Sequence, residues 1–167
     1  FSLAYKLTGN RELANDVAQE AFIRAWKAIQ KFRGDSTFST WIYRITVNTS
    51  KNFLVSKKRK EEILQTDISK DEYYSIEPID TETPEDFLNA SQLKDIISHS
   101  LNNLGEDTKT ALTLREFDGL SYEQIAEVVN CPVGTVRSRI FRGREVIDDA
   151  IKEYRQGNLT KEAEIKS

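Results

Sequence analysis

Residues 121–145 limit the possible folds of this chain more than any other stretch. They open with Ser121–Gln124, a capping-box pattern in which Ser is the cap and Gln stands three residues later. Apolar residues then supply one helical face over Ile125–Val129, and Asn130–Cys131 interrupts it. Pro132 suits the first turn of a second helix. Two short helices joined by a tight turn are therefore predicted, which is the helix-turn-helix arrangement.

The second of these helices has two unlike faces. One face repeats Val136, Ile140 and Ile147 at helical spacing and is expected to pack on the core. The other face is basic and consists of Arg137, Ser138, Phe141, Arg142 and Arg144. Arginine can bond a guanine edge with two parallel hydrogen bonds, and an exposed Phe can contact a thymine methyl group. The pattern predicts a DNA-recognition helix, and the alternative is an αα-hairpin with an incidental basic face.

The overall composition bounds the class of protein. A length of 167 residues allows one domain or two small ones, and 38% hydrophobic with 31% charged residues is typical of a soluble globular chain. No apolar run approaches the ~20 residues of a membrane span, and a single cysteine suits a reducing cytoplasm. One His and one Cys cannot form an ordinary metal site. We therefore expect a cytoplasmic protein with no membrane insertion, no metal and no cofactor.

The charge is distributed unevenly along the chain. Residues 1–60 hold 12 Lys and Arg against 4 Asp and Glu, whereas residues 61–98 hold 2 against 11. Residues 99–167 are close to balanced, with 10 against 12. Since salt screens charges over about 8–10 Å, each part presents its own local charge. The formal net charge of −3 therefore does not exclude a nucleic-acid partner.

The N-terminal part predicts two helices. The end of a helix over Phe1–Leu7 is stopped by Thr8–Asn10, and a second helix runs over Arg11–Lys31. Its expected inner stripe is Leu13, Val17, Ala18, Ala21, Phe22, Ala25 and Ile29. Its opposite face carries Asp16, Gln19, Glu20, Arg24 and Lys27, with Ile23 in the middle and Trp26 at the edge. These two apolar residues are either unremarkable exposed side chains or anchors for a partner helix, and the residues alone leave both open.

A loop and a basic helix follow. Lys31–Thr37 is a loop in which Gly34–Asp35 is the breaker and Ser36 or Thr37 is the cap of a helix over Phe38–Lys58. The expected inner face of that helix is Phe38, Trp41, Ile42, Ile45 and Thr49. Another side carries Arg44, Asn48, Lys51, Val55 and Lys58. Basic charge beside aromatic rings is typical of single-strand binding, and the alternative is a solvated face with a Lys-rich helix end.

The segment over residues 61–90 is predicted to be a flexible acidic linker. It contains Pro78 and Pro84 and lacks sustained periodicity, and so long a structureless stretch is unusual inside one domain. We therefore predict an all-α chain with two small helical domains. The assignments are residues 1–60, the linker 61–90, a second domain over 91–155 and a polar tail over 156–167. Within the second domain, helices are expected over Pro84–Leu104, with Leu93, Ile96, Ile97 and Leu101 inward, then over Asp107–Phe117, and then from the helix-turn-helix to about Tyr154.

Two of these stretches resemble a known family. Asp16–Leu54 looks like region 2, and Leu114–Glu145 looks like region 4, of an extracytoplasmic-function sigma factor. The resemblance is closest to the sigma-E type of envelope-stress sigma factors. The family pattern begins further upstream than Phe1, so we expect the first helix of region 2 to be truncated in this sequence.

The resemblance implies a function without catalysis. Such a protein binds core RNA polymerase, directs it to stress-response promoters and helps open the duplex. The helix over Asp16–Lys31 would bind the clamp coiled coil of the β′ subunit. The residues that the resemblance assigns to this contact are Asp16, Gln19, Glu20, Ile23, Arg24 and Trp26.

The resemblance also assigns the contacts with promoter DNA. Asn48 would wedge into the −10 element, aided by Lys51, and a base flipped from the non-template strand would enter a pocket in the loop. That loop consists of Phe32, Arg33, Gly34, Asp35, Ser36, Thr37 and Phe38. The −35 element would be read in the major groove by Arg137, Ser138, Phe141 and Arg142, helped by Arg115. Family members are commonly inhibited by an anti-sigma factor, often membrane-anchored, which wedges between the two domains.

Two rival functions compete with this one. A transcription factor that binds a palindrome as a dimer would explain the helix-turn-helix but not the basic, aromatic N-terminal part. A nucleic-acid enzyme with a helical DNA-binding tail would need a catalytic constellation, and the sequence offers one His, no metal cluster and no phosphate loop. We therefore expect no catalytic residues.

Overall fold

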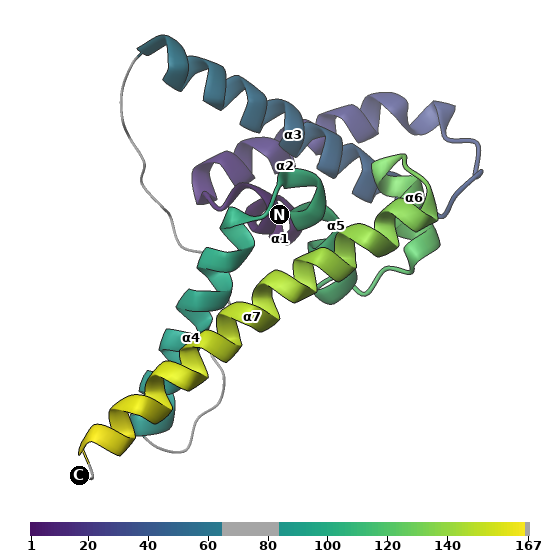
Figure 1. Cartoon of the computed structure of the whole chain (residues 1–167). Coiled ribbons are helices and arrows are strands. Elements are labelled where there is room, and N and C mark those ends of the chain that lie inside the picture. The colour runs from purple at the N-terminus through teal and green to yellow at the C-terminus, as the bar shows by residue number, and fades with distance from the viewer. Residues whose placement is uncertain (65–83, 166–167) are drawn as a thin grey trace.

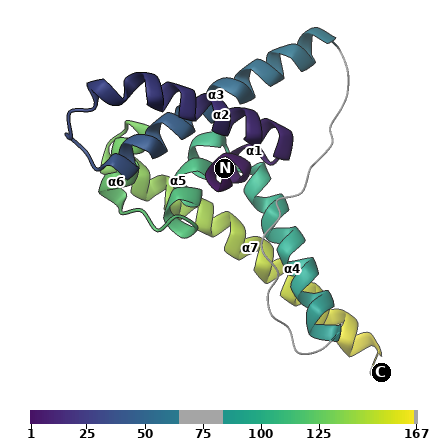
Figure 2. The ribbon, with the colours of Figure 1, turned by 180° about the vertical axis from the view of Figure 1, so that it is seen from behind.

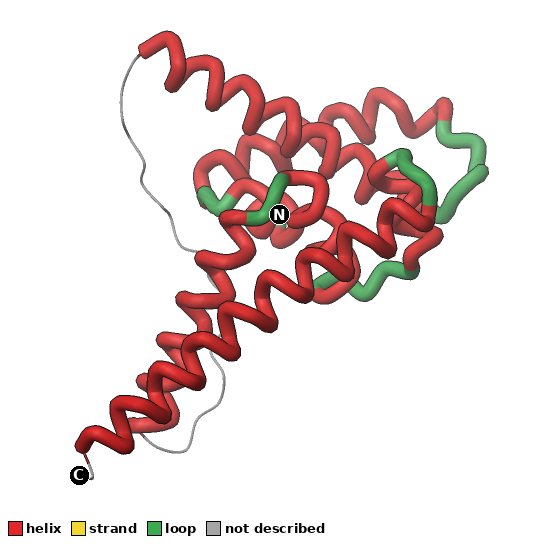
Figure 3. The backbone as a smooth tube through the Cα atoms, in the orientation of Figure 1, coloured by secondary structure: helices red, strands yellow, loops and turns green. Residues whose placement is uncertain are grey.

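The structure is a computed structural model that describes residues 1–64 and 84–165. Every regular element in these two ranges is a helix (Figure 3). The elements in chain order are α1 (Ser2–Thr8), α2 (Arg11–Ala28), the short 3-10 helix η1 (Ile29–Lys31), α3 (Phe38–Leu64), α4 (Pro84–Asn103), α5 (Glu106–Glu116), α6 (Tyr122–Val129) and α7 (Val133–Ile165). The prediction of an all-α fold is confirmed. We call α1–α3 the N-terminal unit and α4–α7 the C-terminal unit.

Local signals set the start of the N-terminal unit. Gly9 has a φ of 68°, in the left-handed region that glycine adopts without strain, and its N–H donates to the Tyr5 carbonyl. The Asn10 side chain then accepts a 2.7 Å hydrogen bond from the Leu13 N–H and caps α2. The chain therefore reverses between α1 and α2, and the two helices pack together.

The next helix begins where a side-chain cap predicts it. The Thr37 hydroxyl accepts a 3.2 Å hydrogen bond from the backbone N–H of Thr40, so Thr37 caps α3. The helix continues to Leu64, past the predicted end at Lys58. Glu61–Glu62 follows Lys57–Lys58 at a spacing of four residues, which favours helix over linker.

The predicted linker over residues 61–90 is therefore helical at both ends. α3 occupies it up to Leu64, and α4 begins at Pro84, a residue well suited to the first turn of a helix. Residues 65–83 lie outside the described part of the chain, and the prediction of a flexible tether falls on them.

The α4 and α7 helices lie side by side and project from the remaining helices as an arm (Figures 1 and 2). The Tyr154 hydroxyl donates a 2.9 Å hydrogen bond to Oε1 of Gln92 across the pair. Leu101 is buried, and its partners on the predicted inner face of α4, Leu93, Ile96 and Ile97, are half-buried. The predicted polar tail over 156–167 is instead helical to Ile165, because no proline follows Pro132 to stop the helix.

The apolar core runs through both units. Its buried side chains come from the N-terminal unit, with Leu3, Leu7 and Val47, and from the C-terminal unit, with Leu101, Ala111, Leu112, Leu114, Leu120, Ile125, Val128, Val136 and Ile140. α1 packs on α5 and α3 packs on α6. The two units are therefore packed against each other in this structure, rather than standing apart.

The predicted inner stripe of α2 is wrong at its C-terminal end. Val17, Ala21 and Ala25 are buried, but Phe22 is 75% exposed and Ile29 is 42% exposed. Phe38, which was assigned to the inner face of α3, is 53% exposed. The physical reason is length, because α1 has only seven residues and covers only the first part of α2.

Candidate nucleic-acid interface

The turn between α6 and α7 has the geometry that its sequence predicts. The Ser121 hydroxyl accepts from the Gln124 N–H at 3.1 Å, and Oε1 of Gln124 accepts from the Ser121 N–H at 2.9 Å, so both halves of the capping box form. Asn130 ends α6 with a φ of 51°, in the left-handed region that asparagine tolerates. Pro132 then accepts the first backbone hydrogen bonds of α7, from the N–H groups of Thr135 and Val136.

The α7 helix separates its two faces as the spacing predicts. Val136 and Ile140 are fully buried, and Ile147 is half-buried against the core. The predicted DNA-facing residues Arg137, Ser138, Phe141 and Arg142 are all exposed. Phe141 is 63% exposed, although a ring of this size gains free energy by burial. The helix therefore presents an open row of cations and one ring.

Arg144 belongs to the same basic face but is engaged by a neighbour. Its Nε and Nη2 donate hydrogen bonds of 3.0 and 2.6 Å to Oε1 of Glu116, which raises the pKa of Arg144. This pair joins the end of α5 to α7. Arg144 thus links the basic face of α7 to α5.

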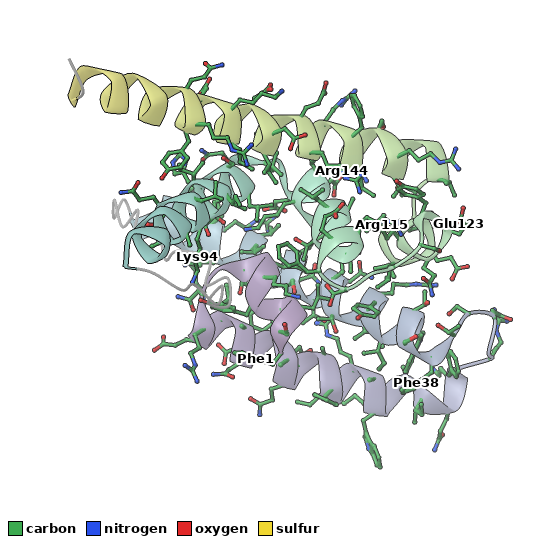
Figure 4. The ribbon with its side chains drawn as sticks, turned by 90° about the horizontal axis from the view of Figure 1, so that it is seen from below. Phe1, Phe38, Lys94, Arg115, Glu123 and Arg144 are labelled. Carbon is green, nitrogen blue, oxygen red and sulfur yellow. The ribbon has the colours of Figure 1, made fainter. Side chains whose placement is uncertain are left out.

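Arg115 lies beside the helix-turn-helix, on α5, and is half-buried. Its guanidinium carbon is 4.9 Å from the ring centroid of Tyr122, and that of Arg137 is 5.7 Å from the same ring. Glu123 is nearby (Figure 4), and its pKa is lowered by backbone and Ser121 hydrogen bonds first, and then by these two arginines. A compact group of charges therefore sits at the start of α6.

The loop over residues 32–37 forms a small pocket at the far end of the N-terminal unit. The pocket has a volume of about 180 Å³ and is lined by Lys31, Phe32, Arg33, Asp35, Ser36, Trp41 and Arg44. The rings of Phe32, Phe38 and Trp41 pack against one another with centroids 5.1–5.8 Å apart. Phe38 lies at this end of the unit in Figure 4. Four of the predicted loop residues, Phe32, Arg33, Asp35 and Ser36, thus line one concavity, whereas Phe38 lines a separate groove.

Two details of the pocket were not predicted from the sequence. Trp41 was assigned to the inner face of α3, and Arg44 to the basic stripe. The Nε atom of Arg44 is buried and has no hydrogen-bond partner in the described part of the chain. A buried donor without a partner is uncommon, which distinguishes Arg44 among the residues that line the pocket. The signal available in the sequence was its position, three residues after Trp41 and therefore on a neighbouring helical turn.

The two predicted −10 residues on α3 differ in their surroundings. Asn48 is exposed, one turn before Lys51. Lys51 is half-buried, and its Nζ donates a 2.7 Å hydrogen bond to Oδ1 of Asp107, at the start of α5. Asn48 is therefore open to a ligand, whereas the Lys51 ammonium is held by the C-terminal unit.

The predicted polymerase face on α2 lies on the surface. Asp16, Gln19, Ile23, Arg24 and Trp26 are exposed, and Glu20 is half-buried. Nε of Arg24 donates a 2.7 Å hydrogen bond to Oε1 of Glu20, one turn earlier on the same helix. Trp26 is 83% exposed, so it is open to a partner.

An apolar groove adjoins this face. It has a volume of about 610 Å³ and is lined by residues of α2, η1 and α3, among them Phe22, Ile23, Trp26, Ile29, Phe38 and Ile42. Sequence reasoning missed it because Phe22 and Ile29 were assigned to the core. The available signal was that Phe22, Trp26 and Ile29 recur at i, i+4 and i+7, which places them on one helical face.

Comparison with known proteins identifies the family. The family described as Sigma-70 region 2 matches residues 1–60, and Sigma-70, region 4 matches residues 94–147. The ECF RNA polymerase sigma-E factor of Haemophilus influenzae is 51% identical over 142 residues, which are 82% of this chain and 74% of the relative. The chain belongs to the extracytoplasmic-function (ECF) sigma factors. This sigma factor is therefore a transcription initiation factor and not an enzyme.

Further similarities agree with this assignment. The RNA polymerase sigma-H factor of Pseudomonas aeruginosa is 47% identical over 152 residues, covering 90% of this sigma factor and 79% of the relative. In three dimensions, the sigma factor RpoE of Bartonella quintana, solved in complex with the anti-sigma factor NepR, matches with a TM-score of 0.68. It is 25% identical, and the match covers 90% of this chain and 88% of that one. The resemblance found in the two sequence motifs is confirmed.

The described residues hold neither a membrane span nor a metal cluster. Among them, no helix is both long enough and apolar enough to cross a bilayer. In the same part of the chain, no three His, Cys, Asp or Glu side chains come together as a metal site would need.

Proposed function

We propose that this ECF sigma factor divides promoter recognition between two surfaces, the DNA-facing side of α7 and the pocket end of α3. The observation that carries the proposal is their exposure. Arg137, Phe141 and Arg142 face solvent on a helix whose opposite side buries Val136 and Ile140, and Asn48 faces solvent on α3. α7 would read the −35 element as duplex, and α3 with the loop 32–37 would hold the opened −10 element.

The α7 surface suits readout of base edges in the major groove. Ser138 and Arg142 lie one turn apart, and Arg137 and Phe141 lie one turn apart beside them. Base-edge contacts set specificity, whereas contacts with phosphate set affinity. Arg115 supports this surface from the side through its position beside Tyr122 and Arg137.

The pocket in the N-terminal unit suits a base taken out of the duplex. Flipping a base costs a few kcal/mol, and an aromatic pocket offsets part of that cost by stacking. The packed rings of Phe32 and Trp41 supply a stacking wall, and Arg44 adds a positive charge to the pocket lining. Asn48, exposed further along α3, would fill the place that the base leaves.

The α2 surface would bind core RNA polymerase. A helical partner such as the β′ clamp coiled coil can insert apolar side chains against Ile23 and Trp26 while its charges meet Asp16, Gln19 and Arg24. Core RNA polymerase and the genome are both in the cytoplasm, so the proposed activity would take place there. The Bartonella quintana relative is bound by an anti-sigma factor, and we propose the same class of regulator here, whether membrane-anchored or free.

The deciding experiment is transcription by purified core polymerase with and without this protein. Supercoiled genomic fragments serve as templates, and sequencing of RNA 5′ ends maps the start sites. We expect start sites that depend on the added chain and that share two upstream elements. If transcription is unchanged and the chain instead binds a palindrome as a dimer, the simple transcription-factor alternative holds.

A pair of variants tests the polymerase contact separately. Trp26→Ala removes a ring that is 83% exposed on α2, and Ile63→Ala removes an apolar side chain that is 80% exposed near the end of α3. We expect Trp26→Ala to weaken co-elution with core polymerase by roughly tenfold or more, as loss of an aromatic anchor does. Ile63→Ala should co-elute like the wild type. Equal behaviour of the two variants would remove Trp26 from the contact.

A further inference from the structure

The α3 helix carries a run of positive charge that no carboxylate of the same stretch balances. Between Phe38 and Lys60 the helix holds six Lys and Arg and no Asp or Glu. Four of the six stand together over residues 57–60. Charges of both signs are usually interspersed on a solvated surface, so a stretch of this length with one sign calls for a specific explanation.

The position of the cluster argues against a role in stabilising the helix end. Cations are favourable in the last turn of a helix, where they offset the helix dipole. The α3 helix continues through Glu62 to Leu64, and its last turn contains no basic residue. Residues 57–60 therefore lie before the turn in which the dipole would favour them.

The cluster is also open to a ligand. Every side chain over residues 55–60 is exposed. In Figures 1 and 2, the end of α3 projects beyond the helices that pack on it. Arg59 and Lys60 form no ion pair with another residue that the structure describes. Their charges are therefore available to an anionic partner.

One side of α3 connects this cluster to the proposed −10 surface. Four exposed residues recur at i, i+4, i+7 and i+11, which places them along a single side of the helix: Asn48, Asn52, Val55 and Arg59. Arg59 lies about 16 Å beyond Asn48 along the helix axis, at ~1.5 Å per residue. This distance is the length of roughly five base pairs of duplex.

The order of the contacts along α3 gives the direction of the DNA. The pocket proposed to hold the flipped base includes Trp41 and Arg44, which precede Asn48 on the helix. Asn48 is proposed to fill the place that the base leaves, at the edge of the opened segment. Beyond Asn48, α3 therefore runs toward unopened duplex upstream of the −10 element, and Arg59 faces that duplex.

We propose that the exposed side of α3 over Asn52–Arg59 is a third promoter contact, which binds phosphates of the duplex between the −10 and −35 elements. This inference rests on the proposed function, because the place of Asn48 fixes where α3 lies on the DNA. Arg59 forms the principal ion pair with phosphate, and Lys58 forms a second from the adjacent side of the helix. Since phosphate is the same at every base pair, the contact adds affinity without reading sequence.

The test compares Arg59→Gln with Lys60→Gln in the holoenzyme formed with core RNA polymerase. Both changes remove one positive charge from an exposed position on α3. At about 100° per residue, Arg59 lies roughly 20° around the helix from Asn48, whereas Lys60 lies roughly 120° from it. The probes carry the mapped −10 sequence as a single non-template strand joined to an upstream duplex without the −35 element. The duplex is either shorter than the roughly five base pairs between Asn48 and Arg59 or longer by a full turn of DNA.

We expect the longer duplex to raise the affinity of the wild-type holoenzyme and Arg59→Gln to remove much of this gain. The slope of log affinity against log salt concentration should become less steep by about 1 for Arg59→Gln, and by about 2 when Lys58→Gln is added. Lys60→Gln should keep the wild-type gain. Arg59→Lys should restore it, since phosphate pairs with either cation. A changed spacer sequence of the same length should leave these values as they are.

The outcomes separate this inference from the proposed function. If the wild-type holoenzyme does not bind even the −10 single strand, the proposed function is the part that is wrong. If it binds that strand, but Arg59→Gln gains as much from the longer duplex as the wild type, the inference is overturned.

Two further results would also contradict the proposal. Equal losses for Arg59→Gln and Lys60→Gln would show a general electrostatic effect, and losses that depend on the spacer sequence would show base readout. Circular dichroism of each variant, and its co-elution with core polymerase, verify that α3 is intact.

Discussion

Arg115 donates a 2.8 Å hydrogen bond from Nη1 to the backbone carbonyl of Leu120, across the turn between α5 and α6. The same guanidinium covers the ring of Tyr122, the first residue of α6. Arg115 therefore fixes the helix-turn-helix on α5, in addition to any contact with DNA. A residue predicted to touch the −35 element thus also stabilises the helix-turn-helix that we propose reads it.

Replacement of Arg115 should lower stability as well as DNA affinity. Arg115→Ala removes a partly buried charged donor and leaves the Leu120 carbonyl without it, at a cost of about 1–3 kcal/mol in the free energy of unfolding. Arg137→Ala removes an exposed arginine near the same ring and should cost less than about 0.5 kcal/mol. Urea denaturation followed by circular dichroism measures both. Similar losses of unfolding free energy for the two variants would contradict the conclusion that Arg115 stabilises the helix-turn-helix.

Asp118 should give the chain an unusual pH dependence. Burial raises the pKa of its carboxyl group above the ordinary value of 3.8, while Lys6 and Tyr43 partly oppose the shift. A raised pKa means that the folded state binds the proton more tightly, so this contribution is present below pH 3.8 and is lost as the pH rises through the raised value. Asp118→Asn removes the titrating group. Its stability relative to wild type should therefore improve between pH 3.8 and pH 7.

Urea midpoints measured across this pH range test the Asp118 prediction. Asp148→Asn is the control, since it removes one negative charge from an exposed position on α7. The difference between Asp148→Asn and wild type should not follow the same trend. A constant difference between Asp118→Asn and wild type over the range would show that the Asp118 carboxyl group titrates alike in the folded and unfolded states.

Two glycines of α7, Gly134 and Gly143, should respond to added side chains in opposite directions. A Cβ at Gly143 would lie 3.0 Å from Cδ2 of Leu112 and 3.3 Å from Cγ2 of Thr108. Gly143→Val should therefore lower the free energy of unfolding by about 1–3 kcal/mol through overpacking. Gly134 has open space around it, and Gly134→Ala should raise the free energy of unfolding by up to about 1 kcal/mol. Thermal or urea unfolding measures the change in the free energy of unfolding for both variants. If Gly143→Val leaves this free energy unchanged, α5 and α7 can separate locally.

Arg142 should contribute to recognition of the −35 sequence rather than to general affinity for DNA. Arg142→Ala is expected to cost about 1–3 kcal/mol at one base pair of the −35 element, and much less on templates already changed at that pair. Transcription from a promoter set with single changes in the −35 element measures the loss at each position. An equal loss on every template would place Arg142 on phosphate instead of on a base.

Much of this protein follows from local signals in its sequence. The Ser121–Gln124 capping box, the break at Asn130 and the inward pair Val136 and Ile140 predict the helix-turn-helix, because each depends on neighbours within a few residues. The same locality makes the exposure of Arg137 predictable. Family resemblance over region 2 and region 4 rests on these local patterns too.

Other features depended on which helices meet in space. The periodicity of α2 placed Phe22 and Ile29 inside, but burial needs a covering partner, and the short α1 covers only the other end of the helix. No local pattern marks Asp107 as the carboxylate between Lys51 and Arg139, since those residues are 56 and 32 positions away along the chain. Short-range chemistry thus determined the helices and their faces. Long-range packing alone decided how the two units close on each other, because contacts between distant residues leave no periodic trace in a sequence.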